Sequence, residues 1–274
     1  MKKHGTTMIL ILVLLIGLSL LLYPTFSDYW NSFHQSQAIA SYAEQVAHLD
    51  QNRYGEIWEE AIAYNESLSK RSNEYILSKE QTAEYEKMLN VGGSGIMGYV
   101  EIPFIGVTLP IYHGTDEAVL QVAVGHLEWT SLPTGGEGTH CVISGHRGLP
   151  SAKLFTDLDK LMVGDIFMMR ILDQVLTYQI DQILIVEPHE SQDLLPVEGE
   201  DLCTLVTCTP YGINSHRLLV RGRRIENIEE AEIVHVTSDA MQIEPILVAP
   251  VVAAPMLLVL LIGLMIPRKR RGKG

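Results

Sequence analysis

Two long apolar stretches lie near the two ends of the chain, and each is long enough to cross a membrane. The first is uncharged from Gly5 to Ser27, and the second from Ile246 to Ile266. At about 1.5 Å of rise per residue, roughly 20 apolar residues span a bilayer core of ~30 Å. We therefore predict an N-terminal transmembrane anchor over residues 1–24 and a C-terminal transmembrane helix over residues 246–266. A cleaved signal peptide is the alternative for the first segment, although no small-residue cleavage pattern precedes Tyr23.

Charge separates the two ends of the chain from its middle. Residues 1–24 and 246–274 carry seven of the 20 basic residues and no acid, whereas all 33 acidic residues lie between them. Basic flanks of membrane segments stay in the cytoplasm, so residues 267–274 are expected to form a cytoplasmic tail and residues 25–245 to lie outside the cell membrane. The middle segment carries a net charge of about −20, which excludes a basic nucleic-acid-binding protein.

A helical region and linker is predicted over residues 25–95. Tyr54-Gly55 is expected to interrupt the first helix, which resumes over residues 57–68, and a further short helix is expected over residues 79–89. The Gly-rich run over residues 90–95 predicts a flexible joint between this helical region and the strands after it. The apolar positions that recur at helical spacing in the first part are Ile39, Tyr42, Val46 and Leu49.

Short strands separated by Gly and Pro dominate residues 96–226, with one short helical stretch expected near 152–158. This pattern favours a β-barrel or sandwich over alternating βα units, so a mostly β domain is predicted there. Residues 227–245 are acidic and are expected to form a spacer before the second membrane segment. The predicted strands are Gly98–Ile102, Val107–Tyr112, Thr139–Ser144, Asp165–Leu172, Val175–Val186, Leu202–Cys208 and Leu218–Arg221.

Cys208 is the candidate nucleophile, because it ends a predicted strand immediately before the turn-forming Thr209-Pro210-Tyr211-Gly212. Strand alternation places Cys203 and Thr207 on the opposite face from Cys208. A cysteine attacks as a thiolate, and its free pKa of about 8.5 leaves little thiolate at neutral pH, so a cationic neighbour is required.

Two residues can supply that positive charge and the proton transfer. His146 follows a predicted strand between glycines, and its imidazole is suited to protonate a leaving amine. Arg217 begins the strand after Cys208, so an antiparallel return brings its guanidinium near the thiol. A fixed donor at that position stabilises negative charge on a reacting carbonyl oxygen.

These residues also carry a family resemblance. The string from Thr204 to Cys208, TLVTC, resembles the TLxTC signature of sortases, and Gly145-His146-Arg147 and Arg217 match that family's histidine and arginine in order and spacing. The segments GYVEIP from Gly98 and LPIYHG from Leu109, and CTPYGIN at the end of the strand, are similar to class C, the pilin-polymerising sortases. The second membrane segment is also typical of that class.

The resemblance implies a mostly β, sortase-like eight-stranded barrel with an N-terminal helical region and two transmembrane helices. It also implies a membrane-anchored cysteine transpeptidase that cleaves an LPxTG-like sorting signal between Thr and Gly and joins the acyl group to a pilin lysine. Cys208 would be the nucleophile, His146 the acid and base, and Arg217 the oxyanion donor. Apart from the resemblance, we take Thr207, next to Cys208, and His216, next to Arg217, as candidate substrate-binding residues. The expected partners are pilin subunits and membrane lipid, and no cofactor or metal is expected.

Other interpretations of the same residues stay open. A housekeeping-type sortase that anchors proteins to peptidoglycan, a cysteine peptidase and a non-catalytic assembly scaffold are the alternatives. An L,D-transpeptidase is disfavoured because His and Gly do not precede Cys208 directly. Cys141 and Cys203 are expected to be small core residues, with a disulfide between them as the alternative.

One departure from class C concerns its lid. Many members carry an Asp-Pro-aromatic motif ahead of the barrel that covers the cysteine, and this sequence contains no Asp-Pro dipeptide. Residues 66–90 instead have the composition of a polar helix and linker. We therefore predict a site that lacks that lid or uses a different one.

Overall fold

The computed structural model describes residues 2–69 and 76–227, which fall into two units, residues 2–30 and 31–227. Helix α1 runs from Lys2 to Ala47, and its segment Thr7–Ala47 is long and apolar enough to cross a membrane, with a mean hydropathy of 2.6 in its most apolar window. Pro24 lies inside this helix, a position that membrane helices tolerate better than helices in water. The predicted C-terminal span and basic tail lie outside the described residues.

The predicted helix break at Tyr54-Gly55 is wrong. Helix α2 runs without interruption from Gln51 to Ser69, and the break between α1 and α2 falls at residues 48–50. The Asp50 side chain accepts a hydrogen bond from the backbone N–H of Arg53 at 2.8 Å, as an N-cap residue does. This cap fixes the start of α2, and a single glycine inside the helix costs only about 1 kcal/mol.

Both helices are fastened to the barrel by a few buried side chains. The Tyr42 hydroxyl donates to the Met97 carbonyl at 2.8 Å and accepts from the Leu172 N–H at 2.7 Å. From α2, Asn65 accepts a hydrogen bond from the Leu132 N–H at 2.7 Å and donates to the hydroxyl of Thr134 at 2.9 Å. Helical spacing places the three buried apolar side chains of α2 on one stripe, which consists of Ile57, Ala61 and Tyr64.

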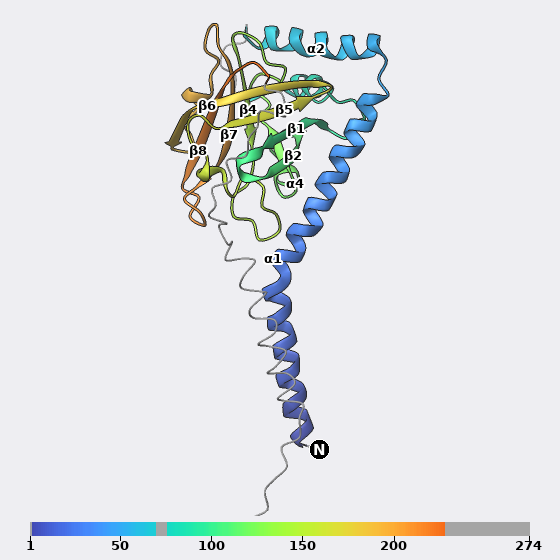
Figure 1. The fold of residues 1–274 in the computed structure, drawn as a ribbon, viewed down its shortest axis with the longest axis vertical. Coiled ribbons are helices and arrows are strands. Elements are labelled where there is room, and N and C mark those ends of the chain that lie inside the picture. The colour runs from blue at the N-terminus through green and yellow to red at the C-terminus, as the bar shows by residue number, and fades with distance from the viewer. Residues whose placement is uncertain (1, 70–75, 228–274) are drawn as a thin grey trace, which may run out of the picture. The chain divides into compact units, whose positions relative to one another are not determined.

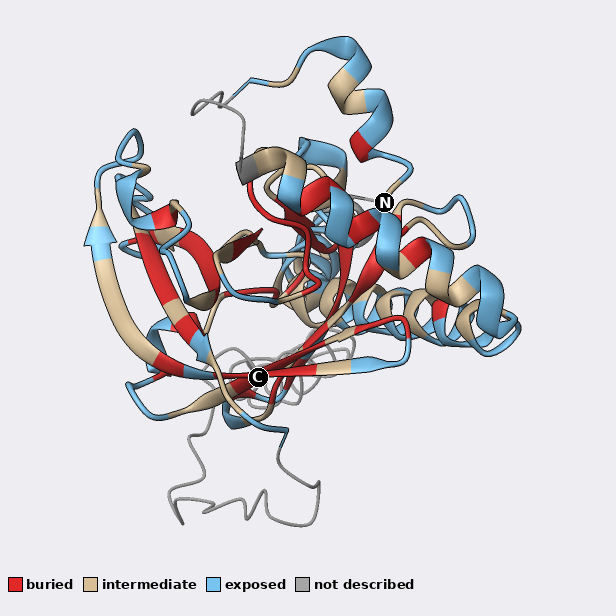
Figure 2. Cartoon of the chain, turned by 90° about the horizontal axis from the view of Figure 1, so that it is seen from above, coloured by how far each residue is buried: buried red, intermediate tan, exposed pale blue. Residues whose placement is uncertain are grey.

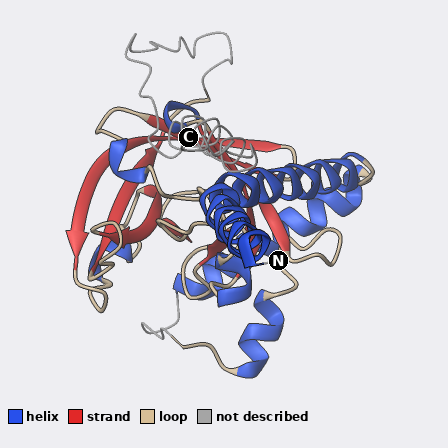
Figure 3. Ribbon diagram, turned by 90° about the horizontal axis from the view of Figure 1, so that it is seen from below, coloured by secondary structure: helices blue, strands red, loops and turns tan. Residues whose placement is uncertain are grey.

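The rest of the described chain is a closed barrel of eight strands in the order β1-β2-β3-β4-β7-β8-β6-β5 (Figure 1). Two pairs are parallel, β2 with β3 and β4 with β7, and the other neighbours are antiparallel. Figure 3 distinguishes these strands from the helices that precede them along the chain. The strands are β1 Ile96–Ile102, β2 Val107–His113, β3 Val124–His126, β4 Thr139–Ser144, β5 Ile166–Ile171, β6 Gln174–Val186, β7 Asp201–Thr209 and β8 His216–Arg224.

The prediction of an eight-stranded barrel with an N-terminal helical region is confirmed. The third helix, α3, is shorter than expected and covers Lys79–Tyr85, and the connection from β2 to β3 holds a four-residue helix, α4, at Glu117–Leu120. Strand β3 has no counterpart among the predicted strands. The helical stretch predicted near 152–158 is wrong, because turns there lead into a 3₁₀ helix, η2, at Leu158–Lys160. The other short 3₁₀ helices are η1 Pro103–Ile105 and η3 Gln192–Leu194.

Apolar side chains gather in two places. The main core fills the barrel and continues under α2 and α3, and the buried residues shown in Figure 2 follow the strands. A second, smaller cluster comprises Val142, Leu194, Val206 and Leu219. Because Leu205 belongs to the main core and its neighbour Val206 to the second cluster, the two clusters lie on opposite faces of β7.

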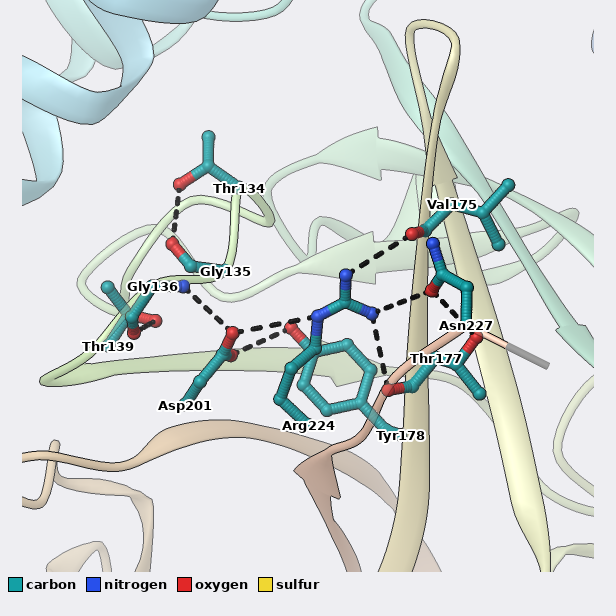
Figure 4. Close-up of polar contacts among 10 residues, drawn as sticks. All are labelled: Thr134, Gly135, Gly136, Thr139, Val175, Thr177, Tyr178, Asp201, Arg224 and Asn227. Atoms are coloured by element: carbon teal, nitrogen blue, oxygen red, sulfur yellow. Dashed lines mark hydrogen bonds and ion pairs between the residues drawn. The ribbon is translucent and has the colours of Figure 1, made fainter.

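A polar network joins β6, β7 and β8 at the end of the barrel where β7 begins (Figure 4). Asp201 accepts hydrogen bonds from the Tyr178 hydroxyl at 3.0 Å and from the Gly136 N–H at 2.8 Å, and Arg224 approaches the same carboxylate at 3.8 Å. Burial raises the pKa of the Asp201 carboxyl. The Arg224 guanidinium also lies 5.8 Å from the centre of the Tyr178 ring, so one arginine secures the last strand to its neighbours.

Candidate active site

Strand β7 presents its two cysteines on opposite faces, as the alternation predicted. Cys203 is fully buried in the main core, whereas Cys208 is half-buried near the end of the strand. Cys208 shares its face with Val206, which belongs to the second apolar cluster. The thiol of Cys208 therefore lies outside the packed interior, where a bound peptide can reach it.

Arg217 lies directly opposite Cys208. In the antiparallel ladder between β7 and β8, Cys208 pairs with Arg217 and Thr209 with His216. On its other side, Arg217 pairs with Val186 of β6. Residues paired across neighbouring strands project to the same face of a sheet, so Cys208, Arg217 and Val186 form one row across three strands.

The parallel ladder between β4 and β7 brings the His146 loop alongside this row. Ser144 pairs with Val206, and the next residue, Gly145, donates its N–H to the Val206 carbonyl at 3.0 Å. The Thr207 hydroxyl donates to the Gly145 carbonyl at 2.7 Å. The chain thus continues from Gly145 into His146 beside the end of β7, where Cys208 lies.

Close packing fixes the backbone of this loop. A Cβ on Gly145 would lie 2.8 Å from both Val124 and the Phe155 ring, so a glycine is required there. The Phe155 N–H in turn donates to the His146 carbonyl at 3.1 Å. The imidazole of His146 is therefore carried on a backbone that has little freedom to move.

Two further side chains, which the sequence motifs did not assign to the site, contact this region. Glu117 of α4 places a carboxylate oxygen 3.6 Å from the His146 Nε2 atom. Arg147, whose side chain is 8% exposed, forms an ion pair with Asp159 and donates to the Thr209 hydroxyl at 3.2 Å. Arg147 thereby ties the His146 loop to the residue that follows Cys208.

The two predicted substrate-binding residues lie in different surroundings. Thr207 is buried, and the hydrogen of its hydroxyl is engaged by the Gly145 carbonyl. His216 is partly exposed, with its Nε2 atom 3.3 Å from Glu187 and its Nδ1 atom 2.8 Å from the Ser215 hydroxyl. Their roles toward substrate stay predictions.

The other two cysteines are neighbours inside the barrel. Cys141 and Cys203 are paired in the β4–β7 ladder, both are buried, and both are free thiols. Burial raises the pKa of the Cys203 thiol well above its ordinary value, and the adjacent Cys141 raises it further. Cys203 is also 3.6 Å from the Met169 sulfur, so both thiols act as core residues.

No group of three or more His, Cys, Asp or Glu side chains arranged to hold a metal ion occurs within residues 2–69 and 76–227. The expected lid region is described only in part, since residues 70–75 lie outside the described chain. Ser78 caps α3, Leu77 packs against the main core, and Tyr85 is buried, with its hydroxyl 3.0 Å from the His126 Nδ1 atom. The absence of the usual lid stays a prediction.

Comparison with known proteins gives consistent matches to one family. The sortase domain family matches residues 100–225. Sortase D of Bacillus subtilis is 30% identical over 131 residues, which cover 47% of this chain and 63% of that protein, less than two thirds of its length. Sortase A of Streptococcus agalactiae is 24% identical over 220 residues, covering 76% of this chain and 82% of that protein.

Solved structures of class C sortases are more similar. The crystal structure of sortase C1 from Streptococcus agalactiae is 49% identical with a TM-score of 0.68, and the match covers 70% of this chain and all of that one. Sortase C from Streptococcus pneumoniae is 51% identical with a TM-score of 0.64, covering 70% of this chain and 97% of that one.

Proposed function

The chain belongs to the sortase family of cysteine transpeptidases, and from this premise we propose that it cleaves an LPxTG-like sorting signal between Thr and Gly and joins the new acyl group to a lysine amine of a pilin subunit. Repetition of this reaction polymerises pilus subunits through isopeptide bonds. The similarity to class C sortases supports this choice, because one of these solved structures is described in terms of pilin substrate specificity.

Cleavage begins at Cys208 in this proposal. Its thiolate attacks the Thr carbonyl carbon, and the Arg217 guanidinium donates hydrogen bonds to the oxygen on which negative charge develops. The bond to Gly breaks as His146 transfers a proton to the leaving amine. The products of this half-reaction are a thioester on Cys208 and a free Gly amine.

Transfer to pilin reverses the roles of the same groups. A lysine amine attacks the thioester carbonyl and gives its proton to His146, Arg217 again stabilises the oxyanion, and the Cys208 thiolate leaves. No water is consumed when the amine is the acceptor. Hydrolysis of the thioester is the competing outcome.

One observation carries this proposal: Cys208 and Arg217 face each other at the open end of β7, and the His146 loop is hydrogen-bonded to β7 at Val206 and Thr207. Cys208, Arg217 and His146 are the residues that match the family motif. The arrangement provides a nucleophile, a fixed cation and a proton carrier at one edge of the barrel.

The face of the barrel next to Cys208 is suited to an apolar peptide. Val206 and Leu219 lie buried on this face, and the partly buried side chains of Leu184 and Val186 of β6 pack against the same cluster. We assign the Leu-Pro part of the sorting signal to the exposed edge of this strip at Leu184 and Val186, with His216 assisting at its end. Thr207 would assist from the opposite face of β7, by holding the Gly145 carbonyl next to His146. Most ligand sites combine such an apolar lining with a few convergent polar groups.

The membrane arrangement completes the proposal. The apolar α1 helix supplies the first anchor, and residues 246–266 supply a second span. Residues 25–245 then face the outside of the cell, where pilin subunits emerge, and both basic ends stay in the cytoplasm. The acidic spacer over residues 227–245 separates the catalytic domain from the second span.

The test is a mass measurement of the detergent-solubilised full-length chain with an LPxTG-like peptide. We expect a thioester adduct on Cys208 that is absent from Cys208→Ala and is consumed when a lysine-bearing pilin domain is added. Release of the acid alone would indicate a peptidase, and use of a peptidoglycan amine in preference to lysine would indicate a housekeeping-type enzyme. Polymer assembly by Cys208→Ala would indicate a scaffold.

A further inference from the structure

Glu117 faces the proton-carrying imidazole from a separate element of the fold. Its Oε2 atom lies 3.6 Å from the His146 Nε2 atom, and its Oε1 atom accepts a hydrogen bond from the Gln121 side chain. The hydrogen bond from Gln121, and then His146, lower the pKa of the Glu117 carboxyl, so it is ionised at neutral pH.

The backbones that carry these two side chains are packed against each other. Helix α4 leads directly into β3, and Val124 of β3 packs against Gly145, the residue before His146. At the end of α4, the Val122 carbonyl accepts a hydrogen bond from Gln35 at 2.7 Å. The approach of Glu117 to His146 therefore reflects the packing of two fixed segments.

Glu117 is the acidic neighbour of His146, because the other charged side chains near this loop have different partners or lie on other strands. Arg147, the next residue in the chain, forms its ion pair with Asp159. Arg217 and Cys208 lie on β8 and β7. In the described part of the chain, Glu117 is the only carboxylate at ion-pair distance from the imidazole.

We propose that Glu117 is a positioning residue for His146, which orients the imidazole with Nε2 toward α4. A carboxylate held beside one ring nitrogen restricts the orientation of a histidine ring. An imidazole held in one orientation is better placed to exchange a proton with the Cys208 thiol.

The expected size of this effect is modest because the Glu117 side chain is 72% exposed. Water and salt screen exposed ion pairs, so loss of this one should slow reactions of the Cys208 thiolate by about two- to fivefold at low ionic strength. The difference should shrink in high salt. The role assigned to Glu117 rests on the proposed function when it is tested with a peptide substrate. It does not rest on that function when the reactivity of the Cys208 thiol is measured directly.

The experiment compares Glu117→Gln, Glu117→Asp and Glu59→Gln with the unmodified full-length chain in detergent. Glu59 is an exposed residue of α2, so Glu59→Gln makes the same change of charge away from the site. The first measurement is the rate of Cys208 alkylation by iodoacetamide as a function of pH and salt. The second is the rate of thioester formation with an LPxTG-like peptide, followed by transfer to a lysine amine.

Support for the proposal is slower alkylation and slower acylation in Glu117→Gln, an altered pH profile, recovery in Glu117→Asp and no change in Glu59→Gln. Unchanged alkylation in Glu117→Gln at low salt would overturn it. If Glu117→Gln changed only the KM for the lysine amine, the proposal would also be overturned. Glu117 would then act on the acceptor amine and not on His146. If no variant forms a thioester but alkylation still depends on Glu117, the proposed substrate is wrong and the role of Glu117 stands.

Discussion

Cys208 and Arg217 are direct partners in the antiparallel ladder between β7 and β8. Their separation is therefore set by backbone hydrogen bonds of the barrel and not by the conformation of the intervening loop. A guanidinium on this frame needs little reorganisation when charge develops on a substrate oxygen, which is the condition under which such donors are most effective.

Replacement of Arg217 by Ala should lower kcat/KM for an LPxTG-like peptide by about 10²–10³-fold, because a fixed donor to the oxyanion is lost. Arg217→Lys should recover only part of the activity, since lysine keeps the charge but not the planar pair of donors. The matched control is Arg223→Ala on the same strand, where the arginine pairs with Glu200. Similar losses in both variants of β8 would contradict the assigned role of Arg217.

Iodoacetamide should modify one cysteine of the folded chain and three after denaturation. Cys208 is half-buried, whereas Cys141 and Cys203 are buried, and burial raises the pKa of the Cys203 thiol. Intact mass before and after denaturation gives the count. The Cys208→Ala variant should show no adduct while folded, and adducts on that variant would mean that the core thiols are accessible.

Gly145→Ala should destabilise the fold by about 1–3 kcal/mol, because a Cβ would press on Val124 and Phe155. The shift should also displace His146 and lower kcat. Gly55→Ala is the control, since its Cβ would meet nothing within 4 Å and should instead stabilise α2 by about 1 kcal/mol. Thermal denaturation and peptide turnover measure the two effects, and wild-type values for Gly145→Ala would refute the packing argument.

Acidification should weaken the fold through His140. Its Nδ1–H group donates to the Leu195 carbonyl at 3.0 Å, and in the neutral ring Nε2 accepts a hydrogen bond from the Thr204 hydroxyl at 2.7 Å. Burial lowers the pKa of this imidazole. The folded state therefore favours the neutral ring, so this stabilisation is complete above the unfolded-state pKa of about 6.5 and is lost as the pH falls toward the lower folded-state value.

The measurement for His140 is the melting temperature between about pH 7.5 and pH 5, the range in which histidine ionises. His140→Gln should flatten the dependence, whereas His189→Gln, at an exposed position, should not. An identical slope in His140→Gln and in the unmodified chain would exclude His140 as its source.

Most strands, and the placement of Cys208 opposite Arg217, were predictable from local pattern. Alternation placed Cys203 and Cys208 on opposite faces of β7, and the short return to Arg217 indicated an antiparallel partner, both of which the structure bears out. Strand β3 was missed because its three residues pair with β2 and β4 only through the tertiary fold. Three residues, one of them Gly125, are too few to show the alternation that identifies a strand.

Two other features depended on contacts that no local pattern carries. The start of α2 is decided by the Asp50 side chain, which outweighs the glycine that suggested a break. Glu117 reaches His146 because α4 and the His146 loop meet across β3, although they belong to different stretches of the chain. Both features arise where tertiary packing or capping overrides local propensity.

The parallel pairing of β4 with β7 determines the stage of folding at which Cys208 gains its neighbours. The cysteine and the histidine loop meet only after the long intervening segment has folded back and the sheet has closed, and such distant pairings form late in folding. An unfolded chain therefore lacks the arrangement of Cys208, Arg217 and the His146 loop that the closed barrel produces. Reactivity of Cys208 is thus expected to be a property of the folded domain and not of the unfolded chain.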